Sequence, residues 1–340
     1  MSAEPTVLSL TPAEVLASVH QELASELAPH ELVWASGDRA DEAGPADEAA
    51  LAGADYVIGD WTHQRMLDAA ALDRAERCLA IFQPTAGVQS IDLDHAAALE
   101  IPVANAPGAN ARAVAEWTVM AILALLKVVW RHHSGVLAGE WKMVEAARTG
   151  VFELGDRTVG IVGFGTIGQG VASRLAGFEL NRLVYADEVA AAPDVERRLG
   201  VERVDLDELL SLSDAVTLHV PLAESTRGLI DARRLALLPR GAVLVNAARG
   251  AVVDEPALCD ALASGHLRGA ALDVFEREPL PADDPLRRLD NVLFSPHLAG
   301  STNEARERMI SMTLRNLDGV LRGNDPSHVV NGVRGVPRRN

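Results

Sequence analysis

The sequence predicts an α/β protein built from two doubly wound parallel sheets. Short apolar segments alternate with helical patterns along most of the chain, which is typical of parallel strands covered by helices. A glycine-rich turn at residues 163–168 opens a second series of the same kind. The length of 340 residues fits two domains, at roughly 150 residues for each.

The first series occupies the N-terminal part of the chain. We expect strands in five apolar segments, at residues 6–10, 31–35, 54–60, 77–83 and 101–106. Helical patterns are expected at residues 12–27 and 63–70. The polar stretch 38–50 contains glycine and proline, so we expect a surface loop that leads into a helix.

A long apolar helix is expected between the two series, from about Ala111 to Arg131, with a looser region at residues 134–156 after it. Its most apolar part, residues 117–130, is shorter than the ~20 residues of a membrane span and contains Lys127. We therefore interpret it as a buried helix.

The second series follows this helix. Its strands are expected at the amino ends of six segments, at residues 158–162, 182–187, 214–222, 242–250, 269–275 and 291–297. The last helical pattern, residues 301–323, comes after the final strand. We expect this helix to pack back on the first domain, which makes that domain discontinuous.

Charge and cysteine content exclude several classes of partner. The net charge is −17, with 31 basic and 48 acidic residues, and a field of this sign repels nucleic acids and anionic membranes. Cys78 and Cys259 form no disulfide framework and no metal-binding pattern. His132 and His133 are adjacent on a helix and point in different directions, so no metal site is expected. The N-terminus lacks a secretory leader pattern, and we expect a cytoplasmic protein.

The glycine-rich turn predicts a dinucleotide site. Gly163, Gly165 and Gly168 have G-x-G-x-x-G spacing between a β-branched strand and a helix, and the next strand ends at Asp187. The glycines allow a tight turn and close approach of a pyrophosphate, and the acid binds a ribose 2′-hydroxyl. The alternative is an ordinary turn with a surface aspartate. Because Glu188 rather than a basic residue follows, a 2′-phosphate meets like charge, and NAD is favoured over NADP.

Three chemically matched residues follow late strands of the second series. They are Arg249, Glu278 and His297, and strand ends of a parallel sheet face the ligand crevice. An arginine holds a carboxylate, a histidine transfers a proton, and an acid beside the histidine favours the imidazolium. Each residue alone has a simpler explanation: a surface arginine, a solvated acid with Glu276 as an equal candidate, or a structural histidine.

Several motifs together resemble the D-2-hydroxyacid dehydrogenase family, which includes phosphoglycerate, glycerate and D-lactate dehydrogenases. The matching segments are NAPGANARAVAEWTV, GFGTIG, LHVPL, LVNAARGAVVDEPAL, ALDVFEREPL and SPHLAGST. The resemblance implies a Rossmann NAD domain at residues 107–298, inserted in a discontinuous flavodoxin-like substrate domain at residues 1–106 and 299–340. It also implies a cleft between the domains, a homodimer formed through the NAD domain, and hydride transfer between NAD(H) and a small 2-hydroxy or 2-oxo acid.

The resemblance also assigns roles to residues. Arg249 binds the carboxylate and carbonyl of the substrate, His297 is the acid/base, and Glu278 pairs with His297. Asp273 contacts the nicotinamide carboxamide. The implied coenzyme-binding residues are Gly163, Gly165, Thr166, Ile167, Gly168, Asp187, His219, Pro221, Ala247, Ala248, Asp273 and Gly300. The implied substrate-binding residues are Thr85, Ala86, Gly87, Val88 and Arg249.

Two loops depart from the pattern of phosphoglycerate dehydrogenases, which carry basic residues there. This chain has Thr85 in one loop and Asp60 with Trp61 in the other, while Arg65 is expected to face solvent. A non-phosphorylated substrate is therefore favoured. The alternatives are D-3-phosphoglycerate dehydrogenase, a phosphite-type dehydrogenase, and a non-catalytic NAD-sensing scaffold. Glu278 disfavours formate, because the formate enzymes that resemble this family pair the histidine with glutamine.

Asp187 generates the first prediction. NADH is expected to give a much higher kcat/KM than NADPH. Asp187→Ala is expected to narrow this gap, because it removes both the ribose hydrogen bond and the repulsion of a 2′-phosphate. Steady-state kinetics with both coenzymes measures the ratio. Equal rates in the unmodified enzyme, or faster turnover with NADPH, contradict the assignment of Asp187.

Overall fold

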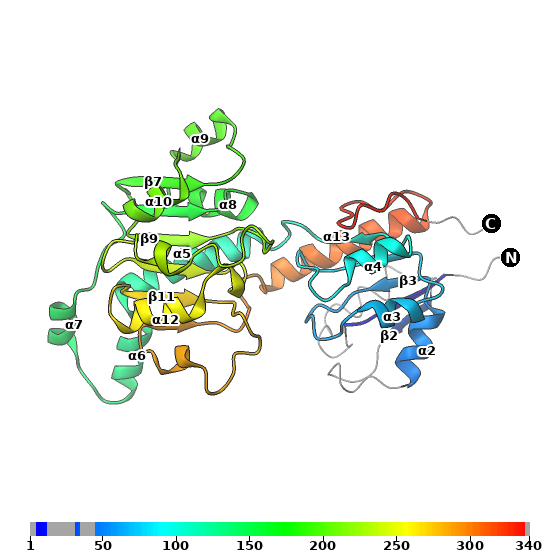
Figure 1. The fold of residues 1–340 in the computed structure, drawn as a ribbon, viewed down its shortest axis with the longest axis horizontal. Helices are drawn as coiled ribbons and strands as arrows, with labels where there is room; N and C mark the ends of the chain where they lie inside the picture. Colours follow the sequence, from blue (N-terminus) through cyan, green and yellow to red (C-terminus); the bar gives the residue numbers. More distant parts are fainter. Residues whose placement is uncertain (1–4, 12–30, 35–44, 337–340) are drawn as a thin grey trace. The chain divides into compact units, whose positions relative to one another are not determined.

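The computed structural model describes residues 5–11, 31–34 and 45–336 (Figure 1). The chain divides into two compact units. Unit 1 consists of Met1–Asn110 and Asn303–Asn340, and unit 2 is Ala111–Thr302. The units change over at residues 110 and 302, where the sequence had suggested 106 and 298.

Unit 1 contains a five-stranded parallel sheet in the order β2-β1-β3-β4-β5. Its strands are β1 (Thr6–Ser9), β2 (Glu31–Trp34), β3 (Tyr56–Ile58), β4 (Ala80–Phe82) and β5 (Val103–Ala104). Its described helices before the insertion are α2 (Pro45–Gly53), α3 (Ala69–Arg74) and α4 (Leu93–Ala98). The strand order is that of flavodoxin-like folds.

Two helix predictions in unit 1 have different outcomes. The helix expected at residues 12–27 lies outside the described residues. The helix expected at residues 63–70 is wrong over most of its length, because α3 begins only at Ala69. The Asp68 carboxylate accepts the Ala71 N–H at 2.8 Å and caps the helix there.

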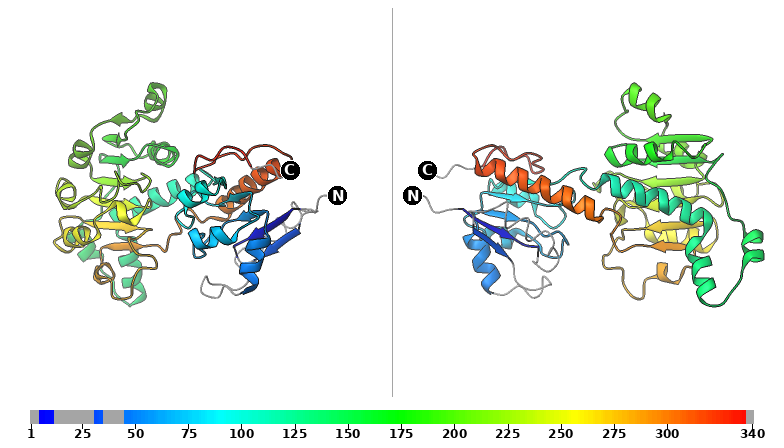
Figure 2. Two further views of the ribbon diagram at one scale, coloured as in Figure 1. Left: turned by 45° about the vertical axis from the view of Figure 1, so that its right-hand side comes forward. Right: turned by 180° about the vertical axis from the view of Figure 1, so that it is seen from behind.

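The C-terminal helix α13 (Asn303–Leu321) belongs to unit 1. Figure 2 shows it running beside the sheet of this unit. Its apolar face packs on side chains of β1, β4 and β5, which makes one core from the two ends of the chain. The residues of α13 in this core are Ile310, Leu314, Leu317 and Val320.

Unit 2 contains a seven-stranded parallel sheet in the order β12-β11-β10-β9-β6-β7-β8. The strands are β6 (Thr158–Val162), β7 (Arg182–Ala186), β8 (Glu202–Arg203), β9 (Ala215–Leu218), β10 (Val243–Asn246), β11 (Gly269–Leu272) and β12 (Val292–Phe294). This order is a Rossmann arrangement that reverses between β6 and β9. The short edge strand β8 is exposed and was not predicted.

Helices cover both faces of this sheet. One core cluster joins the sheet to α5 (Ala111–Lys127) and α8 (Thr166–Leu175). The other joins it to α10 (Leu206–Leu212), α11 (Ala232–Leu235) and α12 (Glu255–Ala263). The helix α9 (Pro193–Leu199) connects β7 to β8. The predicted fold class, two doubly wound parallel-sheet domains, is confirmed.

The predicted long helix is interrupted. The left-handed backbone of Val128, with φ of 51°, ends α5, and α6 (Val129–Leu137) continues at 64° to it. β-Branched residues rarely adopt this conformation, so the sequence did not indicate the break. The region expected to be looser contains most of α6 and also α7 (Met143–Thr149). Within the described ranges, no single helix is long and apolar enough to cross a membrane.

Candidate active site

The glycine turn between β6 and α8 has the geometry that a pyrophosphate requires. At Gly163 the backbone φ is +89°, and a Cβ there would lie 2.7 Å from the backbone of His219. At Gly168 a Cβ would lie 2.3 Å from the Gly163 carbonyl oxygen. By contrast, a Cβ on Gly165 would meet nothing within 4 Å, so this side of the turn is open to a ligand. Thr166 and Ile167 form the first turn of α8, whose N–H groups favour an anion.

Asp187 follows β7 and is tied to the glycine turn. Its Oδ2 accepts the Phe164 N–H at 2.6 Å, and its Oδ1 accepts the Val189 N–H at 2.9 Å. Each carboxylate oxygen keeps a further lone pair, so these bonds leave capacity for a ribose hydroxyl. The acid therefore holds the turn in shape and presents charge beside it.

His219 and Pro221 follow β9, across the reversal in strand order from the glycine turn. The His219 Nε2 lies 2.9 Å from the Thr217 hydroxyl. Burial lowers the pKa of His219 to about 3, so the ring is neutral near pH 7. Its Nδ1 is buried and has no partner among the residues described.

Arg249 stands in a turn that Asn246 shapes. The Asn246 side chain donates to the Arg249 carbonyl at 2.9 Å and accepts the Ala248 N–H at 3.0 Å. The guanidinium donates to the Ala248 carbonyl at 2.7 Å. A Cβ on Gly250 would lie 1.8 Å from the Phe275 carbonyl carbon, so this turn packs directly against the loop that follows β11. Ala247 completes the turn.

Burial influences the charge of this arginine. It lowers the pKa of the Arg249 guanidinium, and the negative charge of Glu278 acts in the opposite direction. Arg249 and Glu278 are thus close enough to influence each other electrostatically.

His297 pairs with Glu278, which is the acid directly before Pro279. The His297 Nδ1–H donates to Glu278 Oε2 at 2.7 Å, and Glu278 Oε1 accepts the Phe275 N–H at 3.0 Å. Partial burial raises the pKa of the Glu278 carboxyl, but these two hydrogen bonds and the charges of His297 and Arg249 lower it overall. Because Nδ1 is occupied, Nε2 is the nitrogen left to exchange a proton with a substrate.

Asp273 holds the loop that carries His297. Its two carboxylate oxygens accept the N–H groups of Leu298 at 2.8 Å and Ala299 at 2.9 Å, and its carbonyl accepts the His297 N–H at 2.8 Å. His297 has a left-handed backbone with φ of 56°, which an L-residue adopts at a cost. Asp273 therefore positions the histidine, a function that the motif did not reveal. Gly300 ends the same loop, and a contact of Asp273 with the nicotinamide stays a prediction.

The substrate-loop residues of unit 1 follow β4. The Thr85 hydroxyl donates to the Gly87 carbonyl at 2.8 Å and lies 3.0 Å from His63 Nε2. The Asn105 side chain donates to the Ala86 carbonyl at 2.7 Å. The predicted residues Thr85 to Val88 thus form a braced loop. The bracing residues His63 and Asn105 come from other loops, and the motifs in the sequence did not indicate them.

Comparisons with known proteins identify the family. Residues 119–299 match the family model for the D-isomer specific 2-hydroxyacid dehydrogenase, NAD binding domain. A glyoxylate reductase of Korarchaeum cryptofilum is 40% identical over 266 residues, which cover 78% of this chain and 80% of that protein. The chain belongs to the D-isomer-specific 2-hydroxyacid dehydrogenase family. It is an NAD-dependent oxidoreductase acting on the CH–OH group of donors.

Two further comparisons agree with this family. The crystal structure of the TT0316 protein of Thermus thermophilus has a TM-score of 0.81 at 33% identity, covering 96% of this chain and 99% of that one. A D-3-phosphoglycerate dehydrogenase of Methanocaldococcus jannaschii is 39% identical over 76% of this chain, but the match spans 49% of that protein. The predicted family, enzyme class and NAD coenzyme are confirmed. The roles of individual site residues stay predictions.

The His297–Glu278 pair generates the second prediction. The lowered pKa of the Glu278 carboxyl keeps it ionised at neutral pH, and its negative charge favours the imidazolium that reduction needs. Glu278→Gln is therefore expected to move the alkaline limb of the kcat/KM profile for 2-oxo acid reduction to lower pH, by about 1 pH unit.

Glu276→Gln is the matched control. The Glu276 N–H donates to Glu255 at 2.6 Å, whereas the Glu278 carboxylate contacts the His297 ring. The control variant is expected to keep the original limb. A profile that shifts in the Glu276 variant and not in the Glu278 variant means that the wrong acid was assigned.

Proposed function

We propose that the chain reduces a small, non-phosphorylated 2-oxo acid with NADH and oxidises the D-2-hydroxy acid in the reverse direction. The observation that carries the proposal is the 2.7 Å contact between His297 and Glu278, beside a charged Arg249. A proton donor, its carboxylate partner and a carboxylate-binding cation are the groups that this reaction needs.

Each of these residues has a distinct part in the reaction. The Arg249 guanidinium binds the carboxylate of the acid and polarises its carbonyl. His297 donates its Nε2 proton to the carbonyl oxygen, and Glu278 stabilises the imidazolium until the proton leaves. Bound NADH supplies the hydride. The glycine turn and Asp187 hold this coenzyme in place.

The loop at residues 60–65 supports a substrate without a phosphate, but not for the reason expected. The Asp60 carboxylate is 2% exposed and accepts the N–H groups of Thr62, Gln64 and Arg65 at 2.9–3.0 Å. It therefore shapes its own loop instead of repelling an anion. The expectation that Arg65 faces solvent is wrong, because its side chain is buried. A buried arginine is less available to a phosphate than an exposed one.

The relatives support the same substrate class. Glyoxylate reductases of Thermofilum pendens and Thermococcus litoralis are 42% and 38% identical and match about four-fifths of their own length. Glyoxylate is a small 2-oxo acid without phosphate. D-3-Phosphoglycerate dehydrogenase remains the second candidate because of its 39% identical relative. Phosphite oxidation and a non-catalytic NAD-sensing scaffold remain the alternatives that turnover assays exclude.

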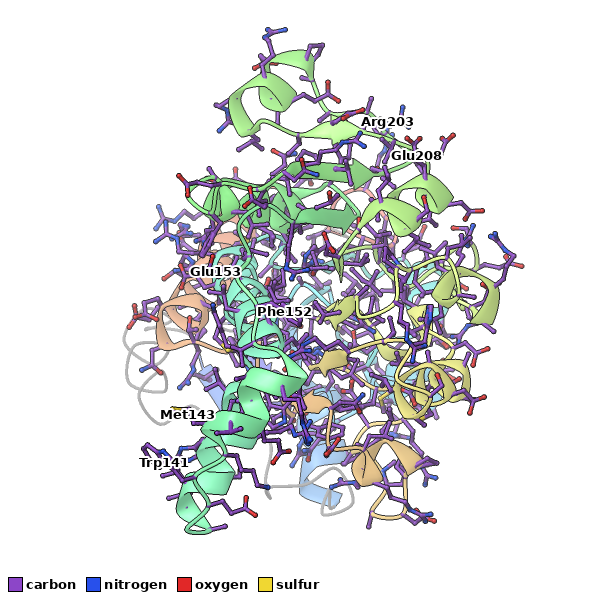
Figure 3. All side chains as sticks on the ribbon, turned by 90° about the vertical axis from the view of Figure 1, so that its left-hand side faces the viewer. Trp141, Met143, Phe152, Glu153, Arg203 and Glu208 are labelled. Carbon is purple, nitrogen blue, oxygen red and sulfur yellow. The ribbon has the colours of Figure 1, made fainter. Side chains whose placement is uncertain are left out.

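We also infer a homodimer from an exposed apolar face on α6, α7 and the segment between them. Neither helix has a buried residue, and Trp141 is 81% exposed. Figure 3 shows Trp141 and Met143 on this face, at the end of unit 2 opposite Arg203. An isolated chain rarely exposes such large apolar side chains together, and a second copy of the same chain covers them. A cytoplasmic location stays a prediction.

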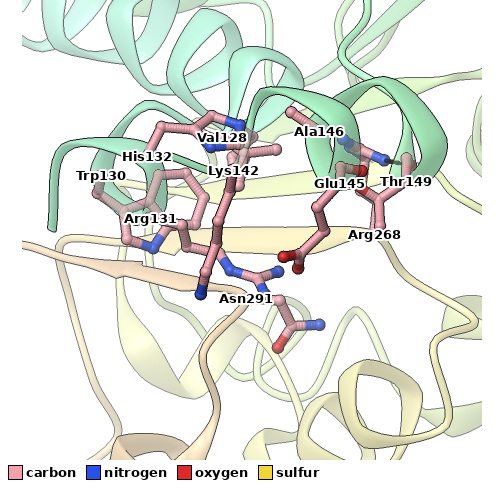
Figure 4. Close-up of a pocket in the computed structure, with 11 residues that line it drawn as sticks. Val128, Trp130, Arg131, His132, Lys142, Glu145, Ala146, Thr149, Arg268 and Asn291 are labelled. Carbon is pink, nitrogen blue, oxygen red and sulfur yellow. Dashed lines mark hydrogen bonds between the residues drawn. The ribbon is translucent and has the colours of Figure 1, made fainter. Parts of the chain in front are cut away.

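A cavity of about 120 Å³ adjoins this face (Figure 4). Arg268 and Asn291, which line it, lie just before β11 and β12, whereas the catalytic residues follow these strands. The cavity is therefore at the opposite edge of the sheet from Arg249 and His297. Its other lining residues are Leu125, Val128, Trp130, Arg131, His132, Lys142, Glu145, Ala146 and Thr149.

The substrate prediction is tested with a panel of 2-oxo acids. Glyoxylate, hydroxypyruvate, pyruvate and a longer aliphatic acid are compared with phosphohydroxypyruvate by the rate of NADH consumption. At least one non-phosphorylated acid is expected to exceed phosphohydroxypyruvate in kcat/KM by about tenfold, since a missing cation contact costs roughly 1.5–3 kcal/mol. An advantage of that size for phosphohydroxypyruvate restores phosphoglycerate dehydrogenase.

The dimer prediction is tested by placing charge on the apolar face. Trp141→Glu combined with Val144→Glu is expected to convert the dimer to a monomer, because two buried carboxylates without partners oppose association. Sedimentation velocity measures the mass. Met66→Glu, at an exposed apolar residue of unit 1, is the control and is expected to leave the dimer intact. A monomeric unmodified enzyme refutes the assignment of this face.

A further inference from the structure

A cation lies on the loop that carries the ribose-binding acid. Arg203 belongs to the edge strand β8, which pairs with β7. Its guanidinium donates to the carbonyl oxygens of Asp187 at 2.8 Å and Glu188 at 3.2 Å. The loop therefore has a basic neighbour that does not adjoin it in sequence, and it is not purely acidic as the residues after Asp187 had suggested.

The charge of Arg203 is not neutralised by an ion pair within the part of the chain that the structure describes. Glu202, its neighbour on β8, pairs with Arg182 at 2.6 Å. Glu196 on α9 accepts a hydrogen bond from the Tyr185 hydroxyl at 2.6 Å. The two carbonyl contacts orient the guanidinium but leave its full positive charge. The side chain is exposed at the outer edge of unit 2 (Figure 3).

This position bears on the choice between NADH and NADPH. The two coenzymes differ by a phosphate on the ribose 2′-oxygen, which is the oxygen that the acid after the second strand reads. The Asp187 carboxylate repels that phosphate, whereas a guanidinium binds phosphate with paired hydrogen bonds. A long exposed side chain can exchange carbonyl contacts for a phosphate without disturbing a core.

We propose that Arg203 is a coenzyme-specificity residue: the guanidinium anchored on the 187–188 carbonyls is a latent 2′-phosphate site that Asp187 opposes. The NADH preference is then a balance between these two charges. The inference rests on the NAD-binding function of unit 2 and not on the identity of the 2-oxo acid. Coenzyme binding measured without substrate therefore tests it even if the proposed substrate class is wrong.

The first experiment compares NADH and NADPH binding by coenzyme fluorescence in Arg203→Ala, Arg203→Gln and Arg203→Lys. The two uncharged variants are expected to weaken NADPH binding about three- to tenfold relative to NADH. Arg203→Lys retains the positive charge and is expected to retain most of the NADPH affinity. Arg182→Ala removes a neighbouring arginine and is expected to leave the ratio unchanged. The effect is expected to shrink at high salt.

The second experiment places the same change in a background without the repulsive charge. Asp187→Asn keeps an oxygen that accepts the Phe164 N–H and is expected to strengthen NADPH binding. Arg203→Ala added to this variant is expected to remove most of that gain. If the gain survives in the double variant, or if Arg203→Ala weakens both coenzymes equally, Arg203 only braces the loop and the proposal is wrong. Melting temperatures of all variants identify any that fail to fold, and Arg203→Gln then replaces Arg203→Ala in the comparison.

Discussion

The arrangement of the candidate site depends on one constraint, the parallel pairing of the strands in unit 2. Parallel strands place all their following loops at the same edge of the sheet, so segments far apart in the chain meet there. The glycine turn follows β6, Asp187 follows β7, and the loops of Arg249 and His297 follow β10 and β12. The backbone contact at Gly250 then brings the Arg249 turn against the loop that carries Glu278.

Side chains that bind backbone groups give these loops their shape. Asp273 accepts two N–H groups beside His297, Asn246 closes the turn before Arg249, and Asp60 accepts three N–H groups of its own loop. A hydrogen bond to a charged group contributes roughly 1.5–3 kcal/mol, which is enough to hold a loop that lacks regular structure. The same bonds fix the direction of the catalytic side chains. Positioning and chemistry are therefore assigned to different residues.

Local charge governs function here more than net charge does. A chain of net charge −17 repels anions at long range, yet its substrate class and its coenzyme are both anionic. Arg249 supplies positive charge at the substrate end of the site, where Glu278 and His297 stand beside it. Arg203 supplies positive charge beside Asp187, at the ribose end. Screening at physiological salt confines each effect to its own neighbourhood.

The sequence by itself determined the elements and the motif residues, because strand periodicity, glycine spacing and the order of strand ends are local properties. It indicated the position of every strand except β8, and it selected Glu278 through the motif before Pro279. Only the tertiary structure decided the break at Val128, the burial of Arg65, the two backbone contacts of the Asp273 carboxylate and the contact of Arg203 with the Asp187 loop. Each of these depends on backbone conformation or on packing between segments distant in the chain, and neither leaves a periodic signal in the residues themselves.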